Sequence, residues 1–398
     1  MKKLLSTLGI ITVLVLGMAI CVVITQDIKH SIQDYVINDL VQDPEELVTR
    51  KTNNKELKNT TPTPINVEQT NLDLIKSLEA TKEEIVEETS QETTEDGRAD
   101  IMTADEKDTG INGEEETTEV VETALNIKNP SIAIDAASAI LMDDTGKVLF
   151  YKNPTESIYP ASTTKLVTAL VALDVCELDD QITVGNEIDS IEKNSSRANL
   201  EIGQKLTLQM LLEGMLIPSG NDAAYSIAAY IGRISLDNRK ASNHDAIQEF
   251  VRLMNAKVEE LGLRDTCFKN PDGYDEEGQY TTAYDMGIIA MAALSNKDIR
   301  EIAGKSKTRN TFLSGEDVTW YSTNKLIMSD SGQYYSHAIG LKTGSSSLAG
   351  SCLVSAARKD DHTYISVVMN STPDGRWEDS IDLLSYGVKG EEETDPEE

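Results

Sequence analysis

The chain has 398 residues and a formal net charge of −32 at pH 7. A protein with so much negative charge repels nucleic acid and anionic lipid headgroups, which excludes nucleic-acid binding through electrostatic attraction. The length allows one large domain or two of ordinary size.

The first predicted element is an apolar segment from residue 4 to residue 25, which follows Lys2 and Lys3. As a helix it would be about 33 Å long, enough to cross a hydrocarbon core of about 30 Å. Because lysines favour the cytoplasmic side, we predict that residues 1–26 form a single-pass anchor in the cell membrane, inserted through residues 4–25, with the rest of the chain outside the cytoplasm. A cleaved signal peptide, which would leave a secreted protein, is the alternative.

Residues 27–128 are acidic and rich in Thr, Glu, Asn and Gln, and they carry about half of the net charge. They contain too little apolar surface to offset the conformational entropy of the chain, so we predict a disordered acidic stalk. The stalk would be a solvated tether that leads to a folded domain at residues 129–390. An acidic tail, residues 391–398, is predicted to follow that domain.

Signals of regular structure begin near Pro130 and predict an α+β domain. Two apolar segments flank Asp144-Thr145-Gly146 and predict a β-hairpin. Helical spacing of apolar residues follows, and strands return near the C-terminus. Strands at both ends with helices between them predict that the hairpin joins the C-terminal strands in one sheet. The predicted helices are residues 162–173, 206–216, 245–261, 282–294 and 377–386, and the C-terminal strands are residues 339–343, 352–357 and 364–369.

The four cysteines and four histidines are widely spaced, and neither a C-x-x-C nor an H-E-x-x-H sequence occurs. We therefore predict no metal site. Buried free thiols are the favoured interpretation of the cysteines, and one disulfide outside the cytoplasm is the alternative.

Ser162-Thr163-Thr164-Lys165 is an S-x-x-K sequence. Residues three apart share one helix face, so the hydroxyl and the amine can touch. The amine can take the serine proton only if it is neutral near pH 7, which burial favours by lowering the pKa of a lysine. The apolar residues after Lys165 predict burial; a lysine at a helix end with its ammonium in water is the alternative. A second match, Ser190–Lys193, lies among charged residues and is interpreted as an exposed chance match.

Two further sequences are weak signals when each is taken alone. Ser219-Gly220-Asn221 predicts a tight loop after a helix, either an ordinary turn or a serine and an amide that relay protons and orient a lysine. Lys342-Thr343-Gly344 ends a predicted strand, where a lysine and a hydroxyl can bind a carboxylate and a glycine lets a substrate backbone approach. Ser322-Thr323-Asn324 is a second match to the S-x-N pattern.

Together and in this order, the three motifs resemble the active-site signature of penicillin-binding proteins and serine β-lactamases. Their flanking residues look like the low-molecular-mass, serine-type D-alanyl-D-alanine carboxypeptidases, and the resemblance covers about residues 132–388. It implies a β-lactamase/transpeptidase-like fold, with an antiparallel sheet flanked by helices and a helical subdomain. The segments that carry it are residues 159–165, 216–224, 270–273, 280–283 and 340–344.

The resemblance also implies a mechanism. Ser162 would attack the carbonyl of the terminal D-Ala-D-Ala bond of a peptidoglycan stem peptide, and Lys165 would take its proton. D-Alanine leaves, water hydrolyses the acyl-enzyme, and no metal or cofactor is needed. Penicillins and other β-lactams would be inhibitors that trap Ser162. The further residues that the resemblance implies are Ser219 and Asn221 for proton relay and substrate contact, Lys342, Thr343 and Gly344 for binding the terminal carboxylate, and the backbone N–H groups of Ser162 and Ser345 for the oxyanion.

Three alternatives share these motifs. A transpeptidase differs only in its acceptor. A serine β-lactamase needs a carboxylate that activates the deacylating water, and no convincing E-x-x-L-N-like segment lies between Ser219 and Lys342. A non-catalytic cell-wall binding protein predicts a broken motif, whereas all three are intact.

Three features depart from the family pattern. Many members attach to the membrane through a C-terminal amphipathic helix, whereas anionic lipid would repel residues 391–398. Many also carry a small β-rich domain after the catalytic domain, for which we expect no room here. The long acidic stalk is unusual.

Overall fold

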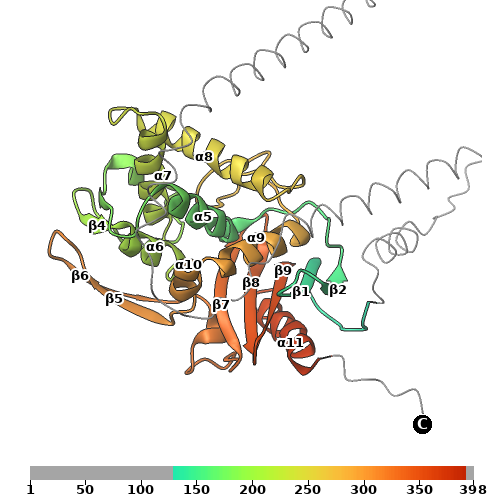
Figure 1. The fold of residues 1–398 in the computed structure, drawn as a ribbon. Helices are drawn as coiled ribbons and strands as arrows, with labels where there is room; N and C mark the ends of the chain where they lie inside the picture. Colours follow the sequence, from blue (N-terminus) through green and yellow to red (C-terminus); the bar gives the residue numbers. More distant parts are fainter. Residues whose placement is uncertain (1–128, 391–398) are drawn as a thin grey trace, which may run out of the picture. The chain divides into compact units, whose positions relative to one another are not determined.

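The computed structural model describes residues 129–390, and Figure 1 shows how their helices and strands are arranged. The predicted anchor, stalk and acidic tail lie outside these residues. Between residues 129 and 390, no helix is both long enough and apolar enough to span a membrane.

A five-stranded antiparallel sheet, in the order β2-β1-β9-β8-β7, forms the centre of the fold. The predicted N-terminal hairpin is confirmed, and β1 pairs with β9, so the two ends of the domain meet in one sheet as predicted. The strands are β1 (Ser138–Asp143), β2 (Val148–Lys152), β7 (Ala338–Ser346), β8 (Gly350–Lys359) and β9 (His362–Ser371).

Helices cover both faces of this sheet. Along β1, Ile140 and Met142 are buried in the core shared with the helical part of the domain, whereas Ala139 and Leu141 are buried against α11 (Gly375–Lys389). The two-residue period of a strand produces this alternation, and burial on both faces explains why residues 139–142 of β1 are all apolar. Figure 1 shows α11 on one side of the sheet and α9 on the other.

The helical part of the domain is built around α5 (Lys165–Val175), which contacts the helices α6, α7, α8 and α9. Residues 165–172 of α5 are all buried, and the lysine at their start is their only charged residue. The surrounding helices are α6 (Leu208–Leu216), α7 (Asn221–Ser235), α8 (Asn243–Glu260) and α9 (Ala283–Ser295). The remaining elements are β3 (Gln181–Thr183), β4 (Lys205–Thr207), α10 (Lys297–Ala303), β5 (Lys307–Thr311) and β6 (Asp317–Tyr321).

Some elements differ from the prediction. The helix predicted from residue 206 begins instead at Leu208, because the preceding residues pair with β3 as strand β4. The loop predicted at Ser219–Asn221 is present, but α7, which starts at Asn221, was not predicted. The β5–β6 hairpin was not predicted either, because β5 contains no apolar residue and β6 has only five residues.

Three cysteines lie within the described residues, and all three are free thiols. Cys176 and Cys352 are buried, whereas Cys267 is partly buried. The favoured prediction of buried free thiols is therefore confirmed for Cys176 and Cys352, whereas Cys267 is a free thiol that is only partly buried. Cys21 lies outside the described residues.

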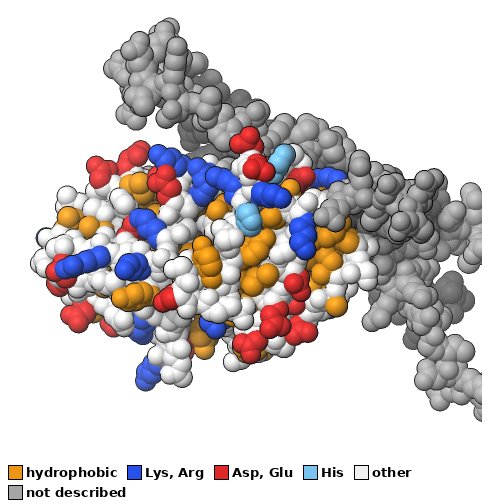
Figure 2. All heavy atoms as spheres, turned by 90° about the horizontal axis from the view of Figure 1, so that it is seen from below, with side chains coloured by type: hydrophobic (Ala, Val, Ile, Leu, Met, Phe, Trp, Pro, Cys, Tyr) orange, Lys and Arg blue, Asp and Glu red, His pale blue; other side chains and the backbone are white. Residues whose placement is uncertain are grey.

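Side chains of both charges cover the face of the domain drawn in Figure 2, with apolar side chains between them. Mixed charge of this kind keeps a protein soluble without creating a strong field of one sign. The folded domain thus differs in charge pattern from residues 27–128, which are dominated by acidic residues.

Candidate active site

The first motif lies in the turn that leads into α5. Ala161–Thr164 form a short 3-10 turn, and Ala161 has a φ of 47°, a left-handed conformation that is uncommon for a residue with a side chain. Close packing holds this conformation, since a Cβ placed on Gly273 would lie 1.7 Å from the carbonyl oxygen of Ala161. The tightly packed turn fixes the position of Ser162 next to α5.

Lys165 is fully buried and points at Ser162. Its Nζ donates hydrogen bonds to Ser162 Oγ at 2.7 Å, to Asn221 Oδ1 at 2.8 Å and to the Asp272 carbonyl oxygen at 2.8 Å. Burial lowers the pKa of Lys165 to about 8, and the carboxylates of Asp272 and Asp222 partly oppose this shift. About one molecule in ten then has a neutral amine at pH 7, which is the form that can take a proton from Ser162.

The second motif joins α6 to α7. Asn221 is the first residue of α7, and its side-chain oxygen faces Lys165. Ser219 is buried with a φ of 67°, and its hydroxyl accepts a hydrogen bond from Lys342 Nζ at 2.9 Å. The loop therefore places one side chain against each of the two buried lysines.

The third motif lies on β7, at the edge of the sheet. Lys342 is fully buried, and its Nζ also donates to the Thr343 carbonyl oxygen at 2.9 Å. Burial lowers the pKa of Lys342 well below 10.5, and the nearby cations Lys165 and Arg376 lower it further. The Thr343 side chain lies at the same edge, with Oγ1 at 2.6 Å from Thr323 Oγ1.

The end of β7 runs beside Ser162. A Cβ placed on Gly344 would lie 3.2 Å from the Ser162 nitrogen, so the two backbones approach closely. Ser345 is exposed; its hydroxyl donates to the Gly344 carbonyl oxygen at 2.7 Å and accepts from Arg376 Nη1 at 2.7 Å. The structure thus brings all the predicted site residues into one cluster: Ser162, Lys165, Ser219, Asn221, Lys342, Thr343, Gly344 and Ser345.

The second S-x-x-K match lies elsewhere. Ser190 ends a short 3-10 helix, and both Ser190 and Lys193 are exposed. The prediction of exposure is confirmed for Ser190 and Lys193, whereas Ile191 between them is buried.

Sequence reasoning assigned no role to two carboxylates beside Lys165. Asp272 is 2% exposed, and burial raises the pKa of its carboxyl although Lys165 opposes the shift. Asp222 is fully buried and accepts hydrogen bonds from the backbone N–H groups of Ala198 and Leu200. Both lie in the segments that carry the family resemblance, but nothing in their local sequence indicates that they face Lys165.

Two more residues of the site lie outside the motif segments that carry the resemblance. Thr323, which follows the β5–β6 hairpin, contacts Thr343. Arg376 near the start of α11 reaches Ser345, and its guanidinium carbon lies 4.5 Å from the ring centroid of Trp377. The only sequence signal was the Ser322-Thr323-Asn324 match, which taken alone is weak.

Comparison with known proteins gives consistent matches. The profile of a family described as D-alanyl-D-alanine carboxypeptidase matches residues 123–373. The chain is 34% identical over 266 residues to the D-alanyl-D-alanine carboxypeptidase DacF of Bacillus subtilis, which covers 65% of this chain and 64% of that protein. It is 32% identical over 274 residues to a D-alanyl-D-alanine carboxypeptidase of Streptomyces sp. strain K15, with 66% of this chain and 90% of that protein covered. The matched part is less than two thirds of the Bacillus protein.

A solved structure shares the fold. The crystal structure of the Streptomyces K15 DD-transpeptidase superposes with a TM-score of 0.60 and 32% sequence identity, covering 66% of this chain and 100% of that chain. The predicted transpeptidase-like α+β fold, with its antiparallel sheet and flanking helices, is therefore confirmed.

Proposed function

Since the chain belongs to the D-alanyl-D-alanine carboxypeptidase family, we propose that it removes the terminal D-alanine from peptidoglycan stem peptides through an acyl-enzyme on Ser162. The observation that carries this proposal is the 2.7 Å contact between Ser162 Oγ and the buried Lys165 Nζ. Burial lowers the pKa of this lysine to about 8, so it can act as a base near neutral pH.

In the proposed acylation, Ser162 Oγ bonds to the carbonyl carbon of the D-Ala-D-Ala bond while its proton passes to Lys165 Nζ. Backbone N–H groups of Ser162 and Ser345 would stabilise the oxyanion, a contact typically worth a hundred- to a thousandfold in rate. The C–N bond then breaks, and the leaving amine takes a proton from Lys165 relayed with the help of Ser219 and Asn221. The closeness of Gly344 to Ser162 supports this placement of the two N–H groups.

The substrate's terminal carboxylate is proposed to bind at β7. Lys342 Nζ donates a hydrogen bond to Ser219 Oγ at this edge, and the Thr343 hydroxyl is the group that can donate to the carboxylate. Hydrolysis of the acyl-enzyme by water would complete the reaction. Penicillins and other β-lactams would acylate the same serine and act as inhibitors.

Transpeptidation is the second candidate, because one solved relative that covers this domain is named a DD-transpeptidase. It would use the same acyl-enzyme and replace water by an amine acceptor. The ratio of free acid to cross-linked product, measured with and without an added acceptor peptide, separates the two activities.

Residues 1–26 are proposed to anchor the chain in the membrane, with residues 27–128 as a stalk, so that the domain acts outside the cytoplasm. The apolar segment at residues 4–25 supports this proposal.

The main test compares two peptides that end in D-Ala-D-Ala, one with a free carboxylate and one amidated. A charge-assisted hydrogen bond contributes about 1.5–3 kcal/mol, and about 1.4 kcal/mol is one decade in rate. We expect kcat/KM, measured by release of D-alanine or its amide, to fall at least about tenfold on amidation. Ser162→Ala should abolish release from both peptides. Equal rates on acid and amide would contradict carboxylate recognition and indicate an endopeptidase.

A further inference from the structure

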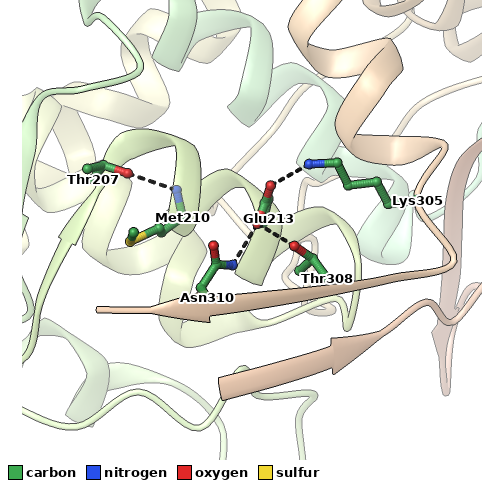
Figure 3. Close-up of polar contacts among 6 residues, drawn as sticks. All are labelled: Thr207, Met210, Glu213, Lys305, Thr308 and Asn310. Carbon is green, nitrogen blue, oxygen red and sulfur yellow. Dashed lines mark hydrogen bonds and ion pairs between the residues drawn. The ribbon is translucent and has the colours of Figure 1, made fainter. Parts of the chain in front are cut away.

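Glu213, in the middle of α6, is a buried carboxylate that the proposed reaction does not use. It is 2% exposed and accepts hydrogen bonds from Lys305 Nζ at 2.6 Å, Thr308 Oγ1 at 2.8 Å and Asn310 Nδ2 at 2.6 Å. Figure 3 shows these three donors converging on it from β5 and the segment before that strand. Burial by itself would raise its pKa, but the bonds from Asn310, Lys305 and Thr308 outweigh this effect and the pKa is lowered. Glu213 is therefore held as an anion and ties the base of the β5–β6 hairpin to α6.

Two further contacts join the hairpin to α6 beyond Glu213. Trp320 of β6 pairs with Thr308 of β5, and its ring packs on Gly214, where an added Cβ would lie 3.1 Å from the ring. One helical turn after Glu213, the Ile217 carbonyl oxygen accepts a hydrogen bond from the Thr323 N–H at 3.1 Å. These contacts fix the hairpin along α6 as far as Thr323, the residue that contacts Thr343.

Thr323 reaches the substrate-binding edge of the sheet. It is exposed, and its Oγ1 lies 2.6 Å from Oγ1 of Thr343, which is 6% exposed. A hydroxyl has one hydrogen to donate. If Thr343 donates that hydrogen to a substrate carboxylate, then Thr323 must be the donor in the pair. Thr323 would then fix the direction of the Thr343 O–H bond.

We propose that Glu213 is a positioning residue for substrate recognition: by holding the β5–β6 hairpin on α6, it places Thr323 where its hydroxyl orients that of Thr343 toward the substrate carboxylate. This inference rests on the proposed role of Thr343 in carboxylate binding. It assigns the hairpin a part in selecting free-acid substrates over amides. Neither Glu213 nor Thr308 touches the reacting atoms, so their effect passes through Thr323.

The test is a double-mutant cycle of Glu213→Gln and Thr323→Val, read as the acid-to-amide ratio of kcat/KM. Each single variant should lower this ratio about three- to tenfold, through kcat/KM on the acid. The double variant should lower it no further than the stronger single variant, because both changes act through one contact. Asp317→Asn, which breaks the exposed pair between Arg309 and Asp317 on the same hairpin, is the matched control and should leave the ratio unchanged.

A purely structural role gives a different result. If Glu213→Gln lowers the Tm while the ratio stays at the wild-type value, or if the two effects add in full, the inference is wrong. Thr308→Val removes one donor and serves as a milder variant should Glu213→Gln fail to fold. A wild-type enzyme without acid preference would instead overturn the proposed function, so the two failures are distinguishable.

Discussion

Lys165 has no exposed surface, and its amine has three hydrogen-bond acceptors. Burial disfavours the ammonium, whereas the acceptors and the carboxylates of Asp272 and Asp222 favour it. The balance leaves a pKa of about 8, between that of a free lysine and that of an amine in an apolar site. The proposed base therefore depends on its neighbours as much as on its own burial.

The pH dependence of acylation should follow this pKa. Because the neutral amine is the base, the acylation rate should rise with pH and level off above about 8. Asp272→Asn removes a negative charge that favours the ammonium form of Lys165. The rise of the acylation rate should therefore occur at lower pH in this variant. Stopped-flow measurement of acylation by a chromogenic β-lactam across pH 5–9 gives the pH at which the rate rises.

The matched control for this experiment is Asp361→Asn at the exposed turn between β8 and β9. It removes the same charge from a residue that does not shift the pKa of Lys165, so the pH dependence of acylation should stay in place. If the acylation rate of Asp272→Asn rises at higher pH than that of the wild type, the electrostatic argument is wrong.

Covalent labelling distinguishes the two S-x-x-K sequences. A labelled penicillin should attach to Ser162 alone, because Ser190 and Lys193 are both exposed and lack the buried amine that lies beside Ser162. Peptide mapping of the adduct identifies the site. Lys165→Ala should reduce labelling by several orders of magnitude and Lys193→Ala should not; label on Ser190 would refute the assignment of the nucleophile.

At the scale of elements, α7 and α8 approach so closely that one position admits only glycine. A Cβ placed on Gly232 of α7 would lie 1.8 Å from the carbonyl oxygen of Ala246 in α8. Ser219 and Asn221 lie at the N-terminal end of the same helix, so the packing of α7 also sets the position of the second motif.

We expect Gly232→Ala to destabilise the domain by about 1–3 kcal/mol or more, because overpacking outweighs the gain in helix propensity. Urea unfolding of the purified protein measures the change in free energy. Gly332→Ala, where nothing lies within 4 Å of an added Cβ, should change stability little. Equal stability of the two variants would show that α8 can move away from α7 at little cost.

At the scale of the whole molecule, the proposed anchor and stalk would determine where the enzyme works. The full chain should sediment with membranes after a high-salt wash and be released by detergent, because residues 4–25 are long enough to span the bilayer. N-terminal sequencing of the recovered protein should begin at or near Met1. A mature N-terminus near Ile20 would indicate a cleaved signal peptide instead.

A fragment of residues 129–390 provides the control. It should stay in the supernatant and keep the acid preference of the full chain, because every residue of the candidate site lies within it. Loss of the preference in the fragment would mean that the stalk takes part in substrate recognition.

The amino-acid sequence by itself determined those features of the protein that depend on residues close together in the chain. The S-x-x-K spacing predicts that Ser162 and Lys165 can touch, since residues three apart share a helix face, and their atoms lie 2.7 Å apart. Apolar periods and turn residues likewise predict the hairpin and the three C-terminal strands. These signals survive because the hydrogen bonds that make helices and hairpins join residues close in the sequence.

Only the tertiary structure decided which distant residues meet. Lys165 contacts Asp272 across 107 positions, Lys342 contacts Ser219 across 123, and Glu213 contacts Thr308 across 95. The resemblance predicted that the three motifs meet, whereas the contacts of Glu213, Thr323 and Asp272 had no such signal. Such contacts arise from the packing of the whole domain, which brings together elements whose own sequences show only that they are buried or exposed.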